Sequence, residues 1–239
     1  MIINYHCSKK LYITTFAFVQ ENTDFMKKCV LLMSGGIDSA VTVHLLKDNN
    51  YEIYPLFIDY KQQALERELK SIRYFCDFFN LNRLKILETD SCKDLFPDII
   101  RNGNLSDLEI SKSLLVNYMP FRNLIFSILG IYYCYEIEAE ALSFGFTKKD
   151  SYSALPDTSP EFVILLNKLL NTILKGKKNI QVINPAFDYY KYDLIKIATK
   201  ANIPLQHTYS CYFDKKCDLC KSCLDAVAAY NKASQINNF

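Results

Sequence analysis

Apolar positions follow two alternating spacings from Lys28 onward. Short aliphatic runs such as residues 29–32 are typical of buried strands, whereas the stretches between such runs carry apolar residues three or four positions apart, as amphipathic helices do. Strands are predicted over 30–33, 54–58, 84–87, 141–145 and 181–183, and helices over 39–47, 62–79, 122–138, 160–174 and 190–201. Strands that alternate with helices predict an α/β fold with a doubly wound parallel sheet.

The periodic pattern also predicts where the chain divides. Residues 1–27 are expected to form an N-terminal extension with β-segments, and residues 28–204 the α/β domain. Residues 205–239 are expected to form a cysteine-rich C-terminal segment. Residues 90–118 have weak periodicity and are interpreted as a mobile lid.

The turn after the first predicted strand is the first candidate site. Its residues are Met33, Ser34, Gly35, Gly36, Ile37, Asp38 and Ser39. Two glycines flanked by hydroxyls let backbone N–H groups converge on an anion, and the following helix adds the positive end of its dipole. A tight turn that merely needs two glycines is the structural alternative. The position between a strand and a helix favours a site for the phosphates of ATP.

A second candidate site lies in the C-terminal segment. Cys211, Cys217, Cys220 and Cys223 fall within thirteen residues, and four thiolates match a closed, structural Zn²⁺ site. A redox-active cysteine pair and cysteines that pack as small hydrophobes are the alternatives. The density of the four cysteines favours zinc.

Composition and charge narrow the function classes. The 239 residues carry 28 basic and 26 acidic side chains, and this near-neutral balance argues against a broad nucleic-acid surface. No apolar segment is long enough to cross a bilayer. Glu21 and Asp24 stand where a signal peptide would carry small residues. We therefore expect a cytoplasmic chain whose nine cysteines are reduced thiols or metal ligands.

The motifs, taken in order, resemble the QueC (ExsB) family of 7-cyano-7-deazaguanine synthases, within the PP-loop ATP pyrophosphatase superfamily. The resemblance rests on Ser-Gly-Gly-Ile-Asp-Ser at 34–39, Phe-Ile-Asp-Tyr-Lys-Gln at 57–62, Met-Pro-Phe-Arg-Asn at 119–123, Gly145, residues 150–157, Thr-Tyr-Ser-Cys-Tyr at 208–212 and the four cysteines.

This resemblance implies an ATP- and Mg²⁺-dependent carbon–nitrogen ligase that adenylates a 7-deazaguanine carboxylate and couples it to ammonia, giving an amide or a nitrile. It implies catalytic roles for Asp38, Arg122 and Lys191, and nucleotide contacts from Ile58 and Asp59 as well as from the glycine turn. It further implies a homodimer, and a substrate pocket formed by Lys61, Phe121, Asn123, Asp150, Tyr152 and Asp157.

The chain departs from the family pattern inside these motifs. The family has glycine at the positions of Lys61, Phe121 and Asp218, Arg-His at positions 63–64, and arginine at Ala226. Together with the N-terminal extension, these changes suggest a second hypothesis, a QueC-like paralogue of the kind associated with some antiviral defence operons, which ligates a deazapurine to a protein amine. A third hypothesis is a non-catalytic subunit that senses nucleotides, which the intact turn at 34–39 disfavours.

Overall fold

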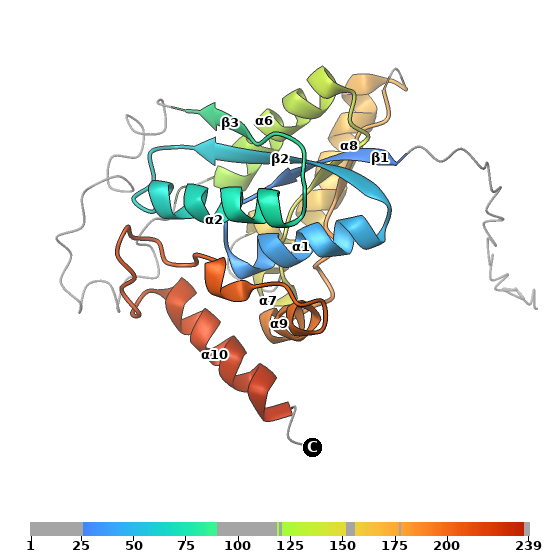
Figure 1. Cartoon of the computed structure of the whole chain (residues 1–239). Coiled ribbons are helices and arrows are strands. Elements are labelled where there is room, and N and C mark those ends of the chain that lie inside the picture. Colours follow the sequence, from blue (N-terminus) through green and yellow to red (C-terminus); the bar gives the residue numbers. More distant parts are fainter. Residues whose placement is uncertain (1–25, 90–118, 120, 152–155, 177, 237–239) are drawn as a thin grey trace, which may run out of the picture.

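A five-stranded parallel sheet lies at the centre of the molecule (Figure 1). The computed structural model describes residues 26–89, 119, 121–151, 156–176 and 178–236. The strands have the order β3-β2-β1-β4-β5, and all neighbouring pairs are parallel. Their bounds are β1 Lys27–Leu32, β2 Tyr51–Asp59, β3 Lys85–Glu88, β4 Ala141–Ser143 and β5 Gln181–Ile183. The predicted doubly wound α/β sheet is confirmed.

Helices cover both faces of this sheet (Figure 1). One face carries α1 (Ile37–Asp48) and α2 (Leu65–Phe78), with α9 (Lys191–Lys200) packed on α1 and α10 (Lys221–Ile236) packed on α9. The other face carries α6 (Arg122–Ile137) and α8 (Pro160–Leu174). The short elements are α7 (Lys148–Ser151), η1 (Pro156–Thr158) and η2 (Leu205–His207). Two buried apolar clusters, one on each face, hold the layers together.

The order of the strands reverses between β1 and β4. The chain moves outward from β1 to β3 and then returns to place β4 on the other side of β1, where Leu31 is in register with Ser143. In open parallel sheets, ligands bind beyond the carboxyl ends of the strands at such a reversal. The glycine turn follows β1, and the segment with α7 follows β4, so both predicted site segments lie at this edge.

Helix α2 begins three residues later than the sequence predicted. The side chain of Gln62 holds the preceding turn, since its Nε2 donates to the carbonyl of Ile58 (3.4 Å) and its Oε1 accepts from the N–H of Tyr60 (3.0 Å). Lys61 has a left-handed backbone, with φ +63°. This turn replaces the first helical residues that the apolar spacing had indicated.

Three predictions fall outside the described residues: the extension before Met26, the interpretation of 90–118 as a lid, and the role of Tyr152. The boundaries after residues 27 and 204 stay predictions. In the part of the chain that the structure describes, no helix is both long and apolar enough to span a membrane.

Candidate active site

The loop between β1 and α1 is held from two sides. The carbonyl of Gly35 accepts hydrogen bonds from the Ser71 hydroxyl on α2 (2.7 Å) and from the N–H of Tyr209 in the C-terminal segment (2.8 Å). Gly35 has φ +74°, and a Cβ at this position would lie 2.8 Å from the carbonyl oxygen of Glu68. Only glycine fits there, so residues distant in the sequence fix the shape of the loop.

Helix α1 presents its N-terminus at the carboxyl edge of the sheet. Gly36 is the N-cap residue, and it has no side chain to accept a hydrogen bond from the first turn. The Ser39 hydroxyl donates to the Gly36 carbonyl (3.1 Å) instead of serving as a cap. The N–H groups of this first turn are therefore available to an anion, and the helix dipole favours negative charge there.

Asp38 and Lys191 form an ion pair beside the loop. The Nζ of Lys191, the first residue of α9, lies 2.9 Å from Oδ2 of Asp38. Burial raises the pKa of Asp38 despite the opposing charge of Lys191. The Oδ1 atom of Asp38 is buried and has no hydrogen-bond partner among the described residues. A buried carboxylate oxygen without a partner is a suitable ligand for Mg²⁺.

Two further carboxylates contribute negative charge to this pair. Asp150 on α7 and Asp225 on α10 both raise the pKa of Lys191, against the effect of its burial. The Oδ2 of Asp150 accepts from the N–H (2.8 Å) and hydroxyl (2.7 Å) of Thr147, while Asp225 pairs with Lys149 at 2.6 Å. Three acids around one buried lysine fit a cation-binding site next to a phosphate site.

A second cluster surrounds Arg122, the first residue of α6. Burial opposes its charge, but the oxygens of Tyr60, Tyr212 and Asp157 face the guanidinium and raise the pKa of Arg122. The Oδ2 of Asp157 also accepts from the N–H of Asn123 (3.1 Å), which fixes the start of the helix. The cluster brings together the turn after β2, α6, η1 and the C-terminal segment around one cation that is suited to a carboxylate or phosphate.

Glu68 on α2 lies beside this cluster. Its Oε2 accepts a hydrogen bond from Nε2 of Gln62 (2.8 Å). Burial raises the pKa of Glu68 to about 7, although Gln62 and the charge of Arg122 act in the opposite direction. A carboxyl group that titrates near neutral pH is suited to accept or release a proton.

Four further residues were predicted for the site: Ile58, Asp59, Lys61 and Phe121. Ile58 is buried, and the carboxylate of Asp59 bonds the N–H (2.8 Å) and Nζ (3.1 Å) of Lys61. Lys61 also pairs with Glu88 at 3.0 Å. The side chain of Phe121 is 69% exposed. Asp59 and Lys61 therefore stabilise their own turn, and their contacts with ligands stay predictions.

Several residues near the site were not predicted from the sequence: Tyr60, Gln62, Glu68, Ser71, Tyr212 and Asp225. One signal was available for Glu68. It lies at helical spacing between Leu65, Leu69 and Ile72, so it places a charge on the apolar face of α2. The contribution of α10 had no local signal, because it depends on the path of the C-terminal segment.

The four cysteines of the C-terminal segment meet at one point. Their Sγ atoms all lie within 4.8 Å of one another, with 3.5 Å between Cys211 and Cys217 and 4.0 Å between Cys211 and Cys220. Four thiolates at about 2.3 Å from a tetrahedral ion would be about 3.8 Å apart, so the cluster fits Zn²⁺ with little movement. Three of the four residues are buried, as a structural site requires.

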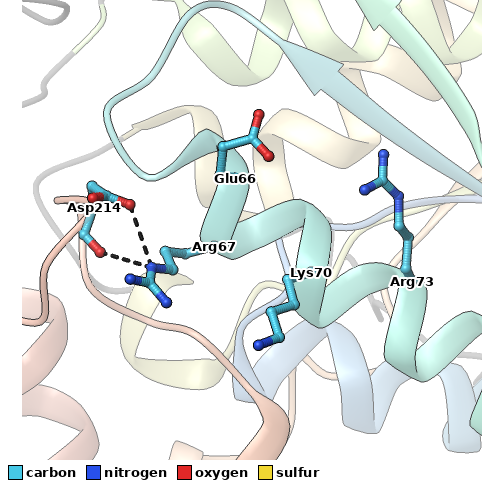
Figure 2. Close-up of a pocket in the computed structure, with 5 residues that line it drawn as sticks. All are labelled: Glu66, Arg67, Lys70, Arg73 and Asp214. Carbon is cyan, nitrogen blue, oxygen red and sulfur yellow. Dashed lines mark hydrogen bonds and ion pairs between the residues drawn. The ribbon is translucent and has the colours of Figure 1, made fainter.

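An open hollow of about 470 Å³ lies between α2 and the loop near Asp214 (Figure 2). The Nε of Arg67 donates to the Asp214 carbonyl (3.1 Å) and lies 3.3 Å from its Oδ1. Figure 2 shows that Glu66, Lys70 and Arg73 point in different directions instead of converging on one point. We interpret this hollow as a contact between α2 and the C-terminal segment, and not as a substrate site.

Comparison with known proteins shows the family to which this chain belongs. A profile described as queuosine biosynthesis protein QueC matches residues 28–234. The 7-cyano-7-deazaguanine synthase of Nautilia profundicola is 33% identical over 87% of this chain and 95% of its own length. The synthase of Acetivibrio thermocellus is 31% identical over 89% and 96%, respectively.

A solved structure shows the same fold. The U34-tRNA thiolase NcsA from Methanococcus maripaludis superposes with a TM-score of 0.50 at 16% identity, over 89% of this chain and 67% of its own. The QueC profile match and the sequence identity to relatives, which align over nearly their whole length, establish the family of this chain. The chain belongs to the QueC family of PP-loop enzymes and is a carbon–nitrogen ligase.

Proposed function

We propose that this enzyme uses ATP and Mg²⁺ to adenylate a 7-deazaguanine carboxylate and couples the activated acid to ammonia. The observation that carries the proposal is the Asp38–Lys191 pair beside the glycine loop, because it combines a buried cation with an unpaired carboxylate oxygen. The names of the QueC relatives supply the product class, a 7-cyano-7-deazaguanine.

Each part of the site has a distinct task in this reaction. The Gly35–Gly36 loop and the N-terminus of α1 would bind phosphates through backbone N–H groups. Lys191 would offset their charge, and Asp38 with Asp150 would hold Mg²⁺, which neutralises further phosphate charge. Arg122 would orient the carboxylate of the substrate.

The chemistry requires activation because a carboxylate is a poor electrophile. Adenylation replaces one carboxylate oxygen by a good leaving group, and pyrophosphate departs. Positioning and charge stabilisation then account for most of the catalysis, and no cysteine or serine nucleophile is required. Because the reaction needs no cysteine nucleophile, we assign the four-cysteine cluster to a structural Zn²⁺ site.

The direct test incubates the purified enzyme with 7-carboxy-7-deazaguanine, ATP and ammonia. We expect AMP, pyrophosphate and a deazapurine amide or nitrile. Lys191→Met should lower the rate about 10²-fold or more, as loss of one charge-stabilising group does. Lys200→Met, at the exposed end of the same helix, is the matched control and should behave as wild type. Pyrophosphate release without a deazapurine product would contradict the proposal.

A protein amine is the second candidate acceptor. The exposed side chain of Phe121 adjoins Arg122, and an exposed aromatic ring at the rim of a site is suited to contact a partner protein. This candidate predicts a covalent protein–deazapurine adduct. Unchanged intact masses of candidate partner proteins would count against it.

The assembly and location of the enzyme are part of the proposal. Ile164, Leu165, Leu169 and Ile173 are exposed on α8, and such an apolar face is suited to pair with a second copy. We expect a homodimer, which light scattering of the purified protein tests. A cytoplasmic location agrees with the reduced thiols that the cysteine cluster needs.

A further inference from the structure

Glu68 is a half-buried carboxyl group with one orienting partner. The Oε1 of Gln62 accepts from the N–H of Tyr60 and its Nε2 contacts the Ile58 carbonyl, so the Gln62 side chain cannot rotate freely. Its Nε2 also bonds Oε2 of Glu68 at 2.8 Å. Among the described residues, no donor bonds the other oxygen, Oε1. Gln62 therefore fixes the carboxyl group while one of its oxygens stays available to a ligand.

Glu68 adjoins both the phosphate loop and the cluster around Arg122. Its backbone carbonyl packs against Gly35 of the phosphate loop. From α6, the charge of Arg122 acts on the carboxyl group. The hydroxyl groups of Tyr60 and Tyr212 lie near that guanidinium, and Glu68 also raises the pKa of Tyr60. Glu68 thus lies where an activated acid would extend from the nucleotide toward Arg122.

Building on the proposed function, we infer that Glu68 is the catalytic residue that accepts the proton of the attacking ammonia. The nitrogen lone pair forms the C–N bond at the carbonyl carbon of the acyl adenylate. One N–H proton moves to Glu68, and the C–O bond to AMP then breaks, with AMP keeping the electron pair. Removing this proton prevents the nitrogen from leaving again as neutral ammonia, so the C–N bond is kept when AMP departs.

The alternatives among the neighbouring groups are less suited to this role. Arg122 stays protonated, and Lys191 is paired with Asp38. Glu68 is unlike both, since its pKa of about 7 lets it be ionised at neutral pH and still hold a proton after transfer. Burial disfavours the ionised form of the carboxyl group, and this desolvation is the largest cause of the raised pKa.

The test compares Glu68→Gln with Glu66→Gln, an exposed carboxylate on the same helix. Two rates are measured: ATP–pyrophosphate exchange that depends on 7-carboxy-7-deazaguanine, and amide formation per unprotonated ammonia. We expect Glu68→Gln to keep the exchange and to lose about 10²–10⁴-fold in amide formation. Glu66→Gln should keep both.

The pH profile supplies the readout that a purely structural role would not change. In the wild type, amide formation per unprotonated ammonia should rise through pH 7 and then level off, and this inflection should be lost in Glu68→Gln. Glu68→Asp should retain the inflection at a lower rate, because it keeps a carboxylate at shorter reach.

Each contrary result has a distinct meaning. If the wild type shows no substrate-dependent exchange, the proposed function fails and this inference fails with it. If the wild type exchanges normally and Glu68→Gln forms amide at an unchanged rate and pH profile, the inference alone is overturned. It is also overturned if Glu68→Gln loses exchange and amide formation equally.

Discussion

Three residues adopt a left-handed backbone at positions where the resemblance to the QueC family implies glycine. Lys61, Phe121 and Asp218 have φ values of +63°, +59° and +56°. The backbone conformation suited to glycine is therefore present although the glycines are not, at a cost of about 1–2 kcal/mol for an ordinary L-residue. Lys61 offsets part of this cost through its ion pairs with Asp59 and Glu88.

Phe121→Gly should stabilise the protein. The substitution relieves the left-handed strain and removes an exposed ring, while glycine adds entropy to the unfolded chain, so the net gain is about 0.5–1 kcal/mol. Urea unfolding measures it. Phe121→Ala is the control, because it removes the ring and keeps the strain. A Phe121→Gly protein no more stable than Phe121→Ala would contradict the strain argument.

Glu68→Gln should change how stability depends on pH. Burial raises the pKa of Glu68 from 4.5 to about 7, so between these values the native state binds more protons than the unfolded state. The free energy of unfolding therefore falls as pH rises through this window, by up to about 3 kcal/mol. Glu68→Gln lacks this loss. We therefore expect the free energy of unfolding of the variant, relative to that of the wild type, to increase from pH 5 to pH 8 in urea titrations. Parallel curves for the two proteins would refute the assignment.

The chemistry of single residues could be predicted only in part. The resemblance implied catalytic roles for Asp38, Arg122 and Lys191, and these roles stay predictions. The structure places Nζ of Lys191 2.9 Å from Oδ2 of Asp38. Glu68 and Asp225 were not predicted, because their significance depends on burial and on neighbours from other elements. A motif specifies residue types along the chain, whereas a pKa depends on the three-dimensional surroundings.

At the scale of elements, the glycine loop joins β1 to α1 with little room for change. Gly35 needs a positive φ and contacts the backbone of Glu68, whereas Gly36 has φ −79° and a Cβ there would only make ordinary van der Waals contacts, the nearest at 3.6 Å. The backbone therefore requires glycine at position 35 but not at position 36, although the two residues are adjacent in the sequence.

Gly35→Ala should destabilise the enzyme by about 2 kcal/mol or more, because the added methyl group meets the Glu68 carbonyl at 2.8 Å in a strained conformation. Gly36→Ala is the matched control, since the nearest atom to its new Cβ would be 3.6 Å away. Thermal unfolding of both variants tests the difference. Equal losses would show that the loop adapts.

Elements with a clear period could be predicted from the sequence. The five strands and the helices now labelled α1, α6, α8 and α9 were expected near their observed bounds, because buried faces impose regular apolar spacing. Helix α10 was not predicted: it packs on α9 through small residues such as Ala229 and Ala233, whose apolar signal is weak. The late start of α2 depends on the side chain of Gln62, which apolar spacing does not report.

At the scale of the whole molecule, the C-terminal segment completes the site. Tyr209 bonds the glycine loop, Tyr212 faces Arg122, and Asp225 adds charge beside Lys191. Tyr209 and Asp225 flank the four-cysteine cluster in the sequence, and Tyr212 lies within it. The cluster therefore anchors a segment that supports the nucleotide site from outside the sheet.

Loss of the metal should loosen the glycine loop. Cys220→Ser is expected to reduce zinc from about one ion per chain, lower the melting temperature and increase hydrogen exchange at residues 33–36. Cys76→Ser is the control, since Cys76 lies on α2 outside the cluster. Elemental analysis and hydrogen-exchange mass spectrometry measure these changes. Full zinc content and unchanged exchange in Cys220→Ser would rule out the coupling.

The hydrogen bond from Tyr209 to Gly35 also concerns the order in which the chain is synthesised. Gly35 leaves the ribosome early and Tyr209 late, so a nascent polypeptide can form its sheet while the loop still lacks one of its supports. We expect the ability to hold ATP to appear only when translation is nearly finished. A message truncated shortly before codon 209 would then yield an inactive product.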